Sequence, residues 1–321
     1  MKKFYMSTSP HVFSRDSVKK VMWNVNFALL PAAVWAILRF GMDAFISMLV
    51  AITAAVLAEW LFAKLFKQKI RLWDGSAFLT GLLMSMTLPP GMPIIFLIVG
   101  AFFAIGFGKA VFGGLGYNPF NPALIGRAFL AASWPVAVIT WKEPTVGALS
   151  SISAEAAGTL TSTIPAEAVD TITSATPLGA LGQAFSLNTQ GVIDGAQLDA
   201  VTGALSSKES ILDLFLGNIG GSLGEISALL LLIGGLYLLW KKIITWHIPV
   251  VYILTIGLLS WVFGGKGLMD GSFLFSIFAG GVFLGAFFMA TDLVTSPMYS
   301  NGKMIYAFLA GVLVVMIRRY G

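Results

Sequence analysis

Cysteine is absent from all 321 residues of this chain. Its absence excludes disulfides, iron–sulfur clusters, thiolate zinc sites and cysteine nucleophiles. Histidine occurs only at His11 and His247, which disfavours a haem held by two histidines. Any redox chemistry must therefore use an organic cofactor, any ion must be bound through oxygen atoms, and we predict no metal site.

Charged residues are also scarce, at 11% of the chain, whereas hydrophobic residues make up 57%. Ordinary soluble domains carry about 25% charged residues, and so few charges could not cover the surface of a soluble fold. The chain is therefore expected to be an integral protein of the lipid bilayer. Its 35 glycines fit this class, because small residues let membrane helices approach closely.

The charges are unevenly distributed along the sequence. Segment 142–216 holds eight acidic and two basic residues, whereas the rest of the chain holds seven acidic and 18 basic ones. Membrane proteins concentrate Lys and Arg in short cytoplasmic loops, and long segments cross regardless of charge. The basic residues therefore indicate helix orientation, and we predict no nucleic-acid partner.

Nine apolar segments are predicted to be membrane spans, which need about 20 apolar residues each. They are 21–41, 44–64, 76–90, 93–112, 121–141, 222–240, 245–263, 272–290 and 304–317. The N-terminal arm, 1–20, lacks a signal-peptide pattern and is expected to be cytoplasmic. Alternation then places the acidic segment 142–216 outside, but it also leaves Arg318 and Arg319 outside, so either a span is misread or a further helix follows.

The predicted fold is an all-α membrane bundle of about nine or ten spans. Several spans are interrupted by glycine and proline, and irregular backbone at membrane depth persists only where protein or a water-filled cavity satisfies it. Broken helices at matching places in two halves are typical of inverted repeats in transporters. Asp74-Gly75-Ser76 and Asp270-Gly271-Ser272 each open a span, so we expect inverted halves at 21–141 and 217–321.

Segment 142–216 separates the halves and is rich in Ser, Thr, Ala and Gly, which predicts an exposed, partly disordered loop. It contains the run Asp170-Thr171-Ile172-Thr173-Ser174-Ala175-Thr176-Pro177. Small neighbours leave the Thr176 hydroxyl accessible, and the following proline favours an extended conformation at Thr176. From composition alone, the run is a threonine-rich surface turn.

The same run closely resembles the motif at which a flavin transferase attaches FMN to threonine through a phosphoester. Four membrane segments resemble the same family, in the same order: 73–90, 109–124, 220–225 and 289–292. Over nearly its whole length the chain is similar to the D subunit of the Rnf ion-translocating ferredoxin:NAD oxidoreductase. That subunit is related to the B subunit of the sodium-pumping NADH:quinone reductase, whose longer N-terminus makes the Rnf member the better match. The family usually continues past Arg318 with one more span.

The resemblance implies a multi-pass subunit of a bacterial cytoplasmic membrane complex that passes electrons between ferredoxin and NAD and exports Na⁺ or H⁺. Thr176 would carry covalent FMN on the extracytoplasmic side, and Asp170 and Thr173 would be recognised by the flavin transferase. The other subunits would include iron–sulfur and flavin proteins, because this chain has neither cysteine nor a dinucleotide-binding fingerprint. The chain would therefore be an incomplete enzyme without catalytic residues of its own.

The resemblance also implies a second, non-covalent flavin, riboflavin, near Asn118 and Asn121. Their amides suit the edge of an isoalloxazine ring, and Lys109 and Asp292 are further candidates. The structural alternative is that the two asparagines turn the chain beside proline and begin the next helix.

Carboxylates inside or beside spans are costly and are therefore candidates for an ion pathway. Asp74, Glu225 and Glu59 meet this description, and Na⁺ or protons could use the same oxygens. The structural alternatives are first-turn acids for Asp74 and Glu225 and a boundary residue near Lys64 for Glu59.

Two other functions also fit the sequence. The broken, inverted halves are compatible with a secondary transporter or channel without a redox role. The family resemblance is compatible with the quinone-reductase subunit.

Overall fold

The computed structural model describes residues 17–68, 70–141, 176–191, 195–217, 220–264 and 269–320. All regular elements in these ranges are helices, with no β-strand among them, which confirms the predicted all-α membrane fold. Asp170 and Thr173 lie outside the described residues.

The first half contains the five predicted spans as helices, with short breaks. The elements are α1 (Val18–Phe40), α2 (Met42–Leu65), η1 (Leu72–Asp74), α3 (Ser76–Met86), α4 (Ile94–Ile105), the π-helical turn η2 (Gly106–Ala110), α5 (Pro122–Ser133) and α6 (Pro135–Ile139). The second half follows a similar pattern, with α12 (Ala228–Trp240), α13 (His247–Phe263), α14 (Phe273–Phe278), α15 (Val282–Leu284), the π-helical turn η3 (Gly285–Met289) and α16 (Ser300–Tyr320). By length and composition, α1, α2 and α16 could each cross a membrane.

The two halves are interrupted at matching places. In each half an Asp-Gly-Ser sequence lies at the start of a short helix, α3 or α14. In each half the next helix then ends in a five-residue π-helical turn that starts at a glycine, Gly106 or Gly285. With five spans before it, the second half would begin on the opposite side of the membrane, so this correspondence supports the predicted inverted halves.

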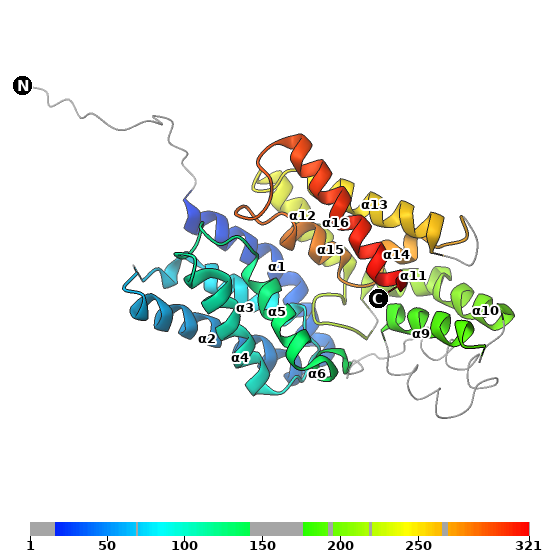
Figure 1. The fold of residues 1–321 in the computed structure, drawn as a ribbon, viewed down its shortest axis with the longest axis horizontal. Helices are drawn as coiled ribbons and strands as arrows, with labels where there is room; N and C mark the ends of the chain where they lie inside the picture. The colour runs from blue at the N-terminus through cyan, green and yellow to red at the C-terminus, as the bar shows by residue number, and fades with distance from the viewer. Residues whose placement is uncertain are drawn as a thin grey trace, which may run out of the picture.

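Small residues let the helices of the core approach closely. A Cβ atom on Gly81 of α3 would lie 2.6 Å from the Cα of Ile52 in α2, so the two backbones are in direct contact. Gly234 of α12 lies against the backbone carbonyl of Ala28 in α1, which joins the two halves. Figure 1 shows the halves side by side, with α1 on the side that faces α12. Close backbone packing of this kind replaces the hydrophobic effect, which does not drive association between helices in lipid.

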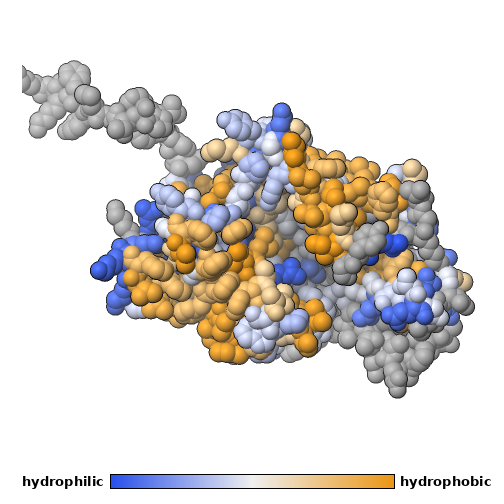
Figure 2. Space-filling view, viewed as in Figure 1, coloured by the Kyte–Doolittle hydropathy of each residue, from blue (hydrophilic) through white to orange (hydrophobic). Residues whose placement is uncertain are grey.

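The outer surface of the bundle is apolar. On α16, the side chains of Ile305, Leu309, Leu313 and Ile317 are each more than half exposed. Orange hydrophobic atoms cover much of both halves in Figure 2. This is the surface expected of helices that face lipid or a partner subunit.

Three helices lie within the segment that composition predicts to be a partly disordered loop: α9 (Pro177–Thr189), α10 (Gly195–Leu205) and α11 (Lys208–Leu216). Leu198, Val201 and Leu205 recur at helical spacing and form a small core that also contains Phe275 of α14. The loop prediction missed these helices because the abundant small polar residues conceal a sparse apolar periodicity.

Arg318 and Arg319, which conflicted with the charge rule, are held by protein contacts. The guanidinium of Arg318 donates hydrogen bonds to the carbonyl oxygens of Ser276 and Ala279, each at 2.8 Å, at the C-terminal end of α14. The guanidinium of Arg319 lies 4.4 Å from the ring centroid of Phe185 in α9. Contacts within the protein therefore account for the position of the two arginines. Their conflict with the charge rule does not require a change in the predicted spans.

We predict that Gly234→Leu destabilises the protein by about 1–3 kcal/mol, because the added side chain pushes α12 away from α1. Thermal unfolding of the purified protein in detergent measures the loss. Gly203→Ala in α10 is the control, since nothing lies within 4 Å of its added methyl group and alanine favours a helix. An unchanged melting temperature for Gly234→Leu would contradict the close packing of the halves.

Candidate functional site

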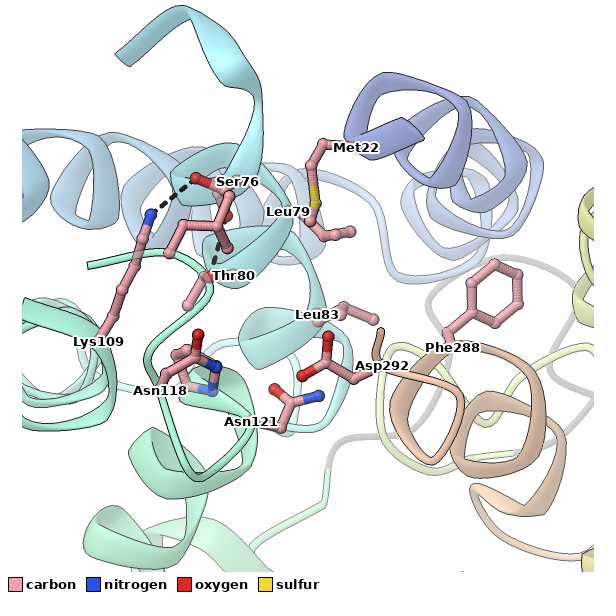
Figure 3. A pocket seen from close by; sticks show the side chains of 12 residues that line it. Met22, Ser76, Leu79, Thr80, Leu83, Lys109, Asn118, Asn121, Phe288 and Asp292 are labelled. Atoms are coloured by element: carbon pink, nitrogen blue, oxygen red, sulfur yellow. Dashed lines mark hydrogen bonds between the residues drawn. The ribbon is translucent and has the colours of Figure 1, made fainter. Parts of the chain in front are cut away.

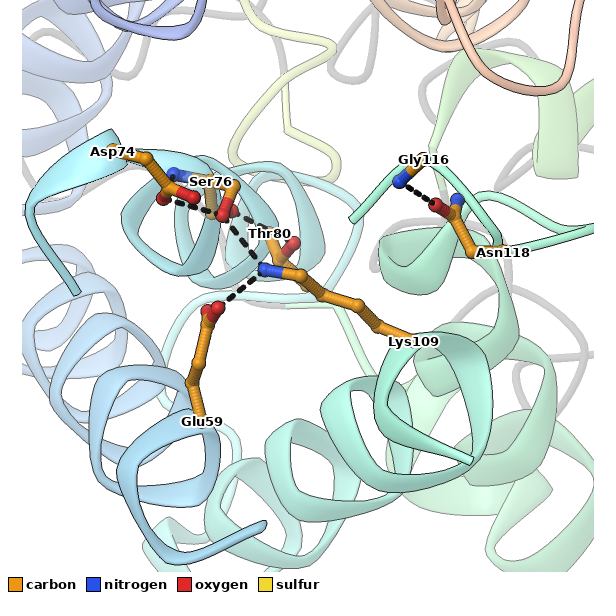
Figure 4. A network of polar contacts seen from close by, with 7 residues as sticks. All are labelled: Glu59, Asp74, Ser76, Thr80, Lys109, Gly116 and Asn118. Carbon is orange, nitrogen blue, oxygen red and sulfur yellow. Dashed lines mark hydrogen bonds and ion pairs between the residues drawn. The ribbon is translucent and has the colours of Figure 1, made fainter. Parts of the chain in front are cut away.

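A buried ammonium group connects three elements of the first half. Lys109 is the fourth residue of the π-helical turn η2 and is only 3% exposed. Its Nζ donates to Glu59 Oε1 of α2 at 2.6 Å and to Ser76 Oγ of α3 at 2.7 Å. Ser76 Oγ in turn donates to Asp74 Oδ1 at 2.6 Å. Figure 4 shows this chain of polar contacts from Glu59 to Asp74.

The charges in this network are incompletely matched. The ammonium pairs directly with Glu59, whose side chain is 11% exposed, and reaches the partly exposed Asp74 only through Ser76. The second oxygen of Glu59, Oε2, is buried and has no hydrogen-bond partner. An unsatisfied carboxylate oxygen in a membrane protein is costly, so it marks a place where a further donor or a cation would be stabilised.

A cavity of about 50 Å³ adjoins this network and lies between the halves. Its polar lining comes from Ser76, Thr80, Lys109, Asn118 and Asn121 of the first half and Asp292 of the second. Leu79, Leu83 and Phe288 are among its apolar lining residues. Figure 3 shows the side chains of Lys109, Asn121 and Asp292 around the same space.

The two asparagines are engaged in local hydrogen bonds. Asn118 accepts a hydrogen bond from the Gly116 amide at 3.2 Å and donates one to the Phe120 carbonyl oxygen at 2.9 Å. Asn121 is the N-cap of α5 and accepts from the Ala123 amide at 3.0 Å. Both therefore perform the turn-forming and capping roles that the sequence offered as the structural alternative.

The cavity as it stands does not fit riboflavin. A volume of about 50 Å³ holds a few water molecules or one partly hydrated ion, whereas pockets for organic ligands span roughly 300–1,000 Å³. The candidate groups Lys109, Asn118 and Asn121 are also already hydrogen-bonded within the chain. In this arrangement, these residues line a small polar cavity.

Asp292 lies in the turn after η3, outside the membrane-spanning segments. Its Oδ2 accepts a hydrogen bond from Thr295 Oγ1 at 3.2 Å, and its Oδ1 accepts one from the Val294 amide at 3.5 Å. Burial raises the pKa of the Asp292 carboxyl above its ordinary value, and the hydrogen bonds oppose this only in part. Burial therefore favours the protonated form of Asp292, and its side chain lines the cavity.

Thr176 lies apart from the cavity and begins a helix of the inserted segment. It is the N-cap of α9, and its Oγ1 accepts a hydrogen bond from the Gly179 amide at 3.1 Å. Amides at a helix N-terminus favour a phosphate, so a phosphoester at this hydroxyl would be stabilised where the chain places it. The residue thus fits the attachment of FMN.

Glu225 lies close to Thr176. A Cβ atom on Gly221 would be 3.3 Å from Glu225 Oε2 and 3.8 Å from Thr176 Cγ2, so the two side chains flank the same glycine. Nearby, the Leu223 amide donates a hydrogen bond to the Leu88 carbonyl oxygen, just beyond the C-terminal end of α3. The network of Lys109 is at the other end of this helix.

The structure therefore separates the predicted ion residues into two groups. Asp74 and Glu59 share the network of Lys109 at the start of α3. Glu225 lies beside the threonine, near the end of α3.

Sequence reasoning missed Ser76 and Thr80, which contribute hydroxyl groups to the cavity. The position of Ser76 directly after Asp74-Gly75 was the available signal. It also missed the link between Lys109 and Glu59, because 50 residues separate the two partners.

We predict that Asp292→Asn flattens the pH dependence of stability. Because the pKa of this acid is raised in the folded protein, its contribution to stability is present at low pH and is lost as the pH rises through that pKa. The stability that is lost on raising the pH through that pKa should therefore be smaller in the variant than in the parent, as measured by melting temperatures in detergent over a pH series. Asp270→Asn, at an exposed carboxylate, is the control, and identical pH profiles for the parent and Asp292→Asn would refute the prediction.

Comparison with known proteins assigns nearly the whole chain to one protein family. The model of the NQR2, RnfD, RnfE family matches residues 5–321. The D subunit of a proton-translocating ferredoxin:NAD(+) oxidoreductase complex from Clostridium ljungdahlii is 45% identical over 319 residues, which cover 99% of this chain and 87% of the relative.

Two further relatives are similar over nearly the whole chain, at somewhat lower identity. The D subunit of the Na(+)-translocating ferredoxin:NAD(+) oxidoreductase complex of Acetobacterium woodii is 40% identical, over 98% of this chain and 85% of its own length. The D subunit of an ion-translocating oxidoreductase complex from Stutzerimonas stutzeri is 38% identical, over 96% of this chain and 84% of its own length.

Proposed function

The chain belongs to the NQR2, RnfD, RnfE family and is a membrane subunit of an ion-translocating oxidoreductase complex, and from this premise we propose that it carries electrons on FMN bound covalently to Thr176. In this proposal, the electron flow between ferredoxin and NAD⁺ through the complex drives the export of Na⁺ or H⁺. The observation that carries the proposal is the position of Thr176. The last threonine of the Asp170–Thr176 run is partly exposed and lies at the N-terminus of α9.

The residues around Thr176 support a tethering role. A flavin accepts and donates one or two electrons, which the side chains of this chain cannot do. The amides of the first turn of α9 would stabilise the negative charge of the phosphoester. A covalent link also keeps the flavin at a high effective concentration beside its electron partners and prevents its loss to the medium.

We predict that Thr176→Asn removes the flavin fluorescence of this subunit on a denaturing gel, together with an FMN-sized mass increment on the peptide that contains residue 176. Asparagine caps a helix as well as threonine does, so α9 is kept while the acceptor hydroxyl is lost. Ser207→Ala is the matched control, because it removes the N-cap of α11 without touching the acceptor. A fluorescent band that persists in Thr176→Asn would exclude this attachment site.

The network of Lys109 and the adjoining cavity form the proposed inner part of the ion pathway. The unsatisfied Glu59 Oε2 and the raised pKa of Asp292 support this role, and so does a cavity of about 50 Å³, whose size suits one partly hydrated ion. Asp74 and Glu225 complete the proposed pathway at opposite ends of the bundle. The relatives include both proton-translocating and Na⁺-translocating complexes, so either ion fits.

We predict that Asp74→Asn and Glu225→Gln each reduce ion uptake driven by electron transfer in inverted membrane vesicles by about tenfold or more. Each substitution removes one carboxylate and preserves the shape of the side chain. Uptake of radiolabelled Na⁺ and quenching of a pH-sensitive dye together measure both ions, with Asp270→Asn as the control. Unchanged uptake of both ions in both variants would exclude these residues from the pathway.

Several finer points stay predictions. The proposed role requires partner subunits that carry iron–sulfur clusters and flavins, and a flavin transferase that attaches FMN. It also predicts that the chain lies in the cytoplasmic membrane with Thr176 on the external side. A second flavin would have to bind outside the cavity as it stands, or in a widened form of it, and extraction of non-covalent flavin from the purified subunit tests this. A transporter without a redox role would be colourless after denaturation. If the chain were instead the quinone-reductase subunit, membranes that contain its complex would reduce quinone and would not oxidise ferredoxin.

A further inference from the structure

Arg318 carries a positive charge that no acidic side chain pairs with in the described part of the chain. It is half-buried at the C-terminal end of α16. Its Nη1 and Nη2 donate hydrogen bonds to the carbonyl oxygens of Ser276 and Ala279, and it makes no ion pair with any residue of the described ranges. A guanidinium has five N–H donors, and a cation away from water is stabilised by an anion. The two carbonyl groups therefore leave the charge of Arg318 unmatched and use only part of its donors.

Arg318 lies beside the first turn of α9, where the proposed flavin tether begins. A Cβ atom on Gly280 would lie 2.9 Å from Arg318 Nη2 and 3.6 Å from Leu178 Cδ2. Leu178 is the second residue of α9 and follows Thr176 by two positions. The guanidinium and the start of α9 thus meet at the same glycine.

Two more glycines and Glu225 form the other side of this place. A Cβ atom on Gly281 would lie 3.5 Å from Glu225 Oε1, and one on Gly221 would lie 3.8 Å from Thr176 Cγ2. Gly281 has a φ of −75°, which any residue can adopt, and its Cβ would meet no atom closer than 3.5 Å. Neither backbone strain nor close packing therefore requires a glycine at position 281. The missing side chain leaves backbone that another group can approach closely.

We propose that Arg318 binds the phosphoester of the FMN on Thr176, with the phosphate seated against the backbone of Gly280 and Gly281. This role of Arg318 rests on the proposed attachment of FMN to Thr176. The phosphoester keeps one negative charge, which matches the single positive charge of the guanidinium. The planar guanidinium can present two N–H groups to two phosphate oxygens at once, which a lysine ammonium does not do.

Glu225 opposes this contact. Its carboxylate borders both Gly221 and Gly281 and interacts electrostatically with Arg318, so it would repel the phosphoester and compete for the guanidinium. Removal of the two charges should therefore have opposite effects on the stability that FMN attachment adds. A role of Arg318 that is limited to holding the end of α14 would be the same with and without FMN.

The rise in melting temperature on FMN attachment tests the proposal on the purified full chain in detergent. The parent and each variant are produced with and without the flavin transferase, and the intact mass gives the share of the chain that carries FMN. We expect Arg318→Gln to lose about half or more of the rise seen in the parent, Arg318→Lys to lose less, and Glu225→Gln to show a larger rise. Each variant is compared with its own unmodified form, so the lost contacts to α14 cancel. Arg319→Gln is the matched control, because it removes the next arginine, which lies over Phe185, and should keep the rise.

Three results would overturn the role of Arg318 and leave the attachment of FMN standing. They are a parent that carries FMN without any rise, an equal rise in the parent and Arg318→Gln, and equal losses in Arg318→Gln and Arg319→Gln. A parent that carries no FMN after production with the transferase would overturn both proposals. If Arg318→Gln fails to fold, Gly281→Ala decides, since its methyl group fits the unmodified chain but occupies the place proposed for the phosphate. An unchanged rise in Gly281→Ala would overturn the proposed contact.

Discussion

A charge inside a membrane protein requires a partner, and the contact between Lys109 and Glu59 is the interaction on which the end of the bundle where α3 begins depends. It explains why α4 ends in a π-helical turn, because the wider turn carries the lysine inward. It also explains why η1 and α3 break at Asp74 and Ser76, whose side chains extend the same network. The irregular backbone and the buried charges thus satisfy one another, which is the condition for either to persist away from water.

The molecule divides its proposed tasks between two ends. Asp74, Lys109 and Asp292 gather where α3 and α5 begin and where η2 and η3 end. Thr176 and Glu225 flank Gly221 near the opposite end of α3. Electron transfer near Thr176 and ion binding near Lys109 would therefore be separated by the bundle. A change at one end would have to reach the other through packed helices, of which α1 and α12 join the halves directly.

The segment between the halves is a folded part of this arrangement. Helix α9, which Thr176 begins, is fixed to the second half by Phe275 and by Arg319 over Phe185. Arg318 binds the end of α14. The proposed flavin attachment point is thus held close to the spans that follow it, so a flavin tethered there would start from a defined position on the protein.

The sequence alone determined the class of the protein. Its few charges required a membrane, its apolar runs located most of the helices to within a few residues, and the motif around Thr176 and the four membrane segments indicated the family. Only the tertiary structure decided which residues act together. It joined Lys109 to Glu59 across 50 residues, assigned Asn118 and Asn121 to local turns, and formed helices in a segment whose composition indicated a loop. The reason is physical: composition and periodicity report how each segment meets lipid or water, whereas the pairing of buried charges depends on which segments pack side by side.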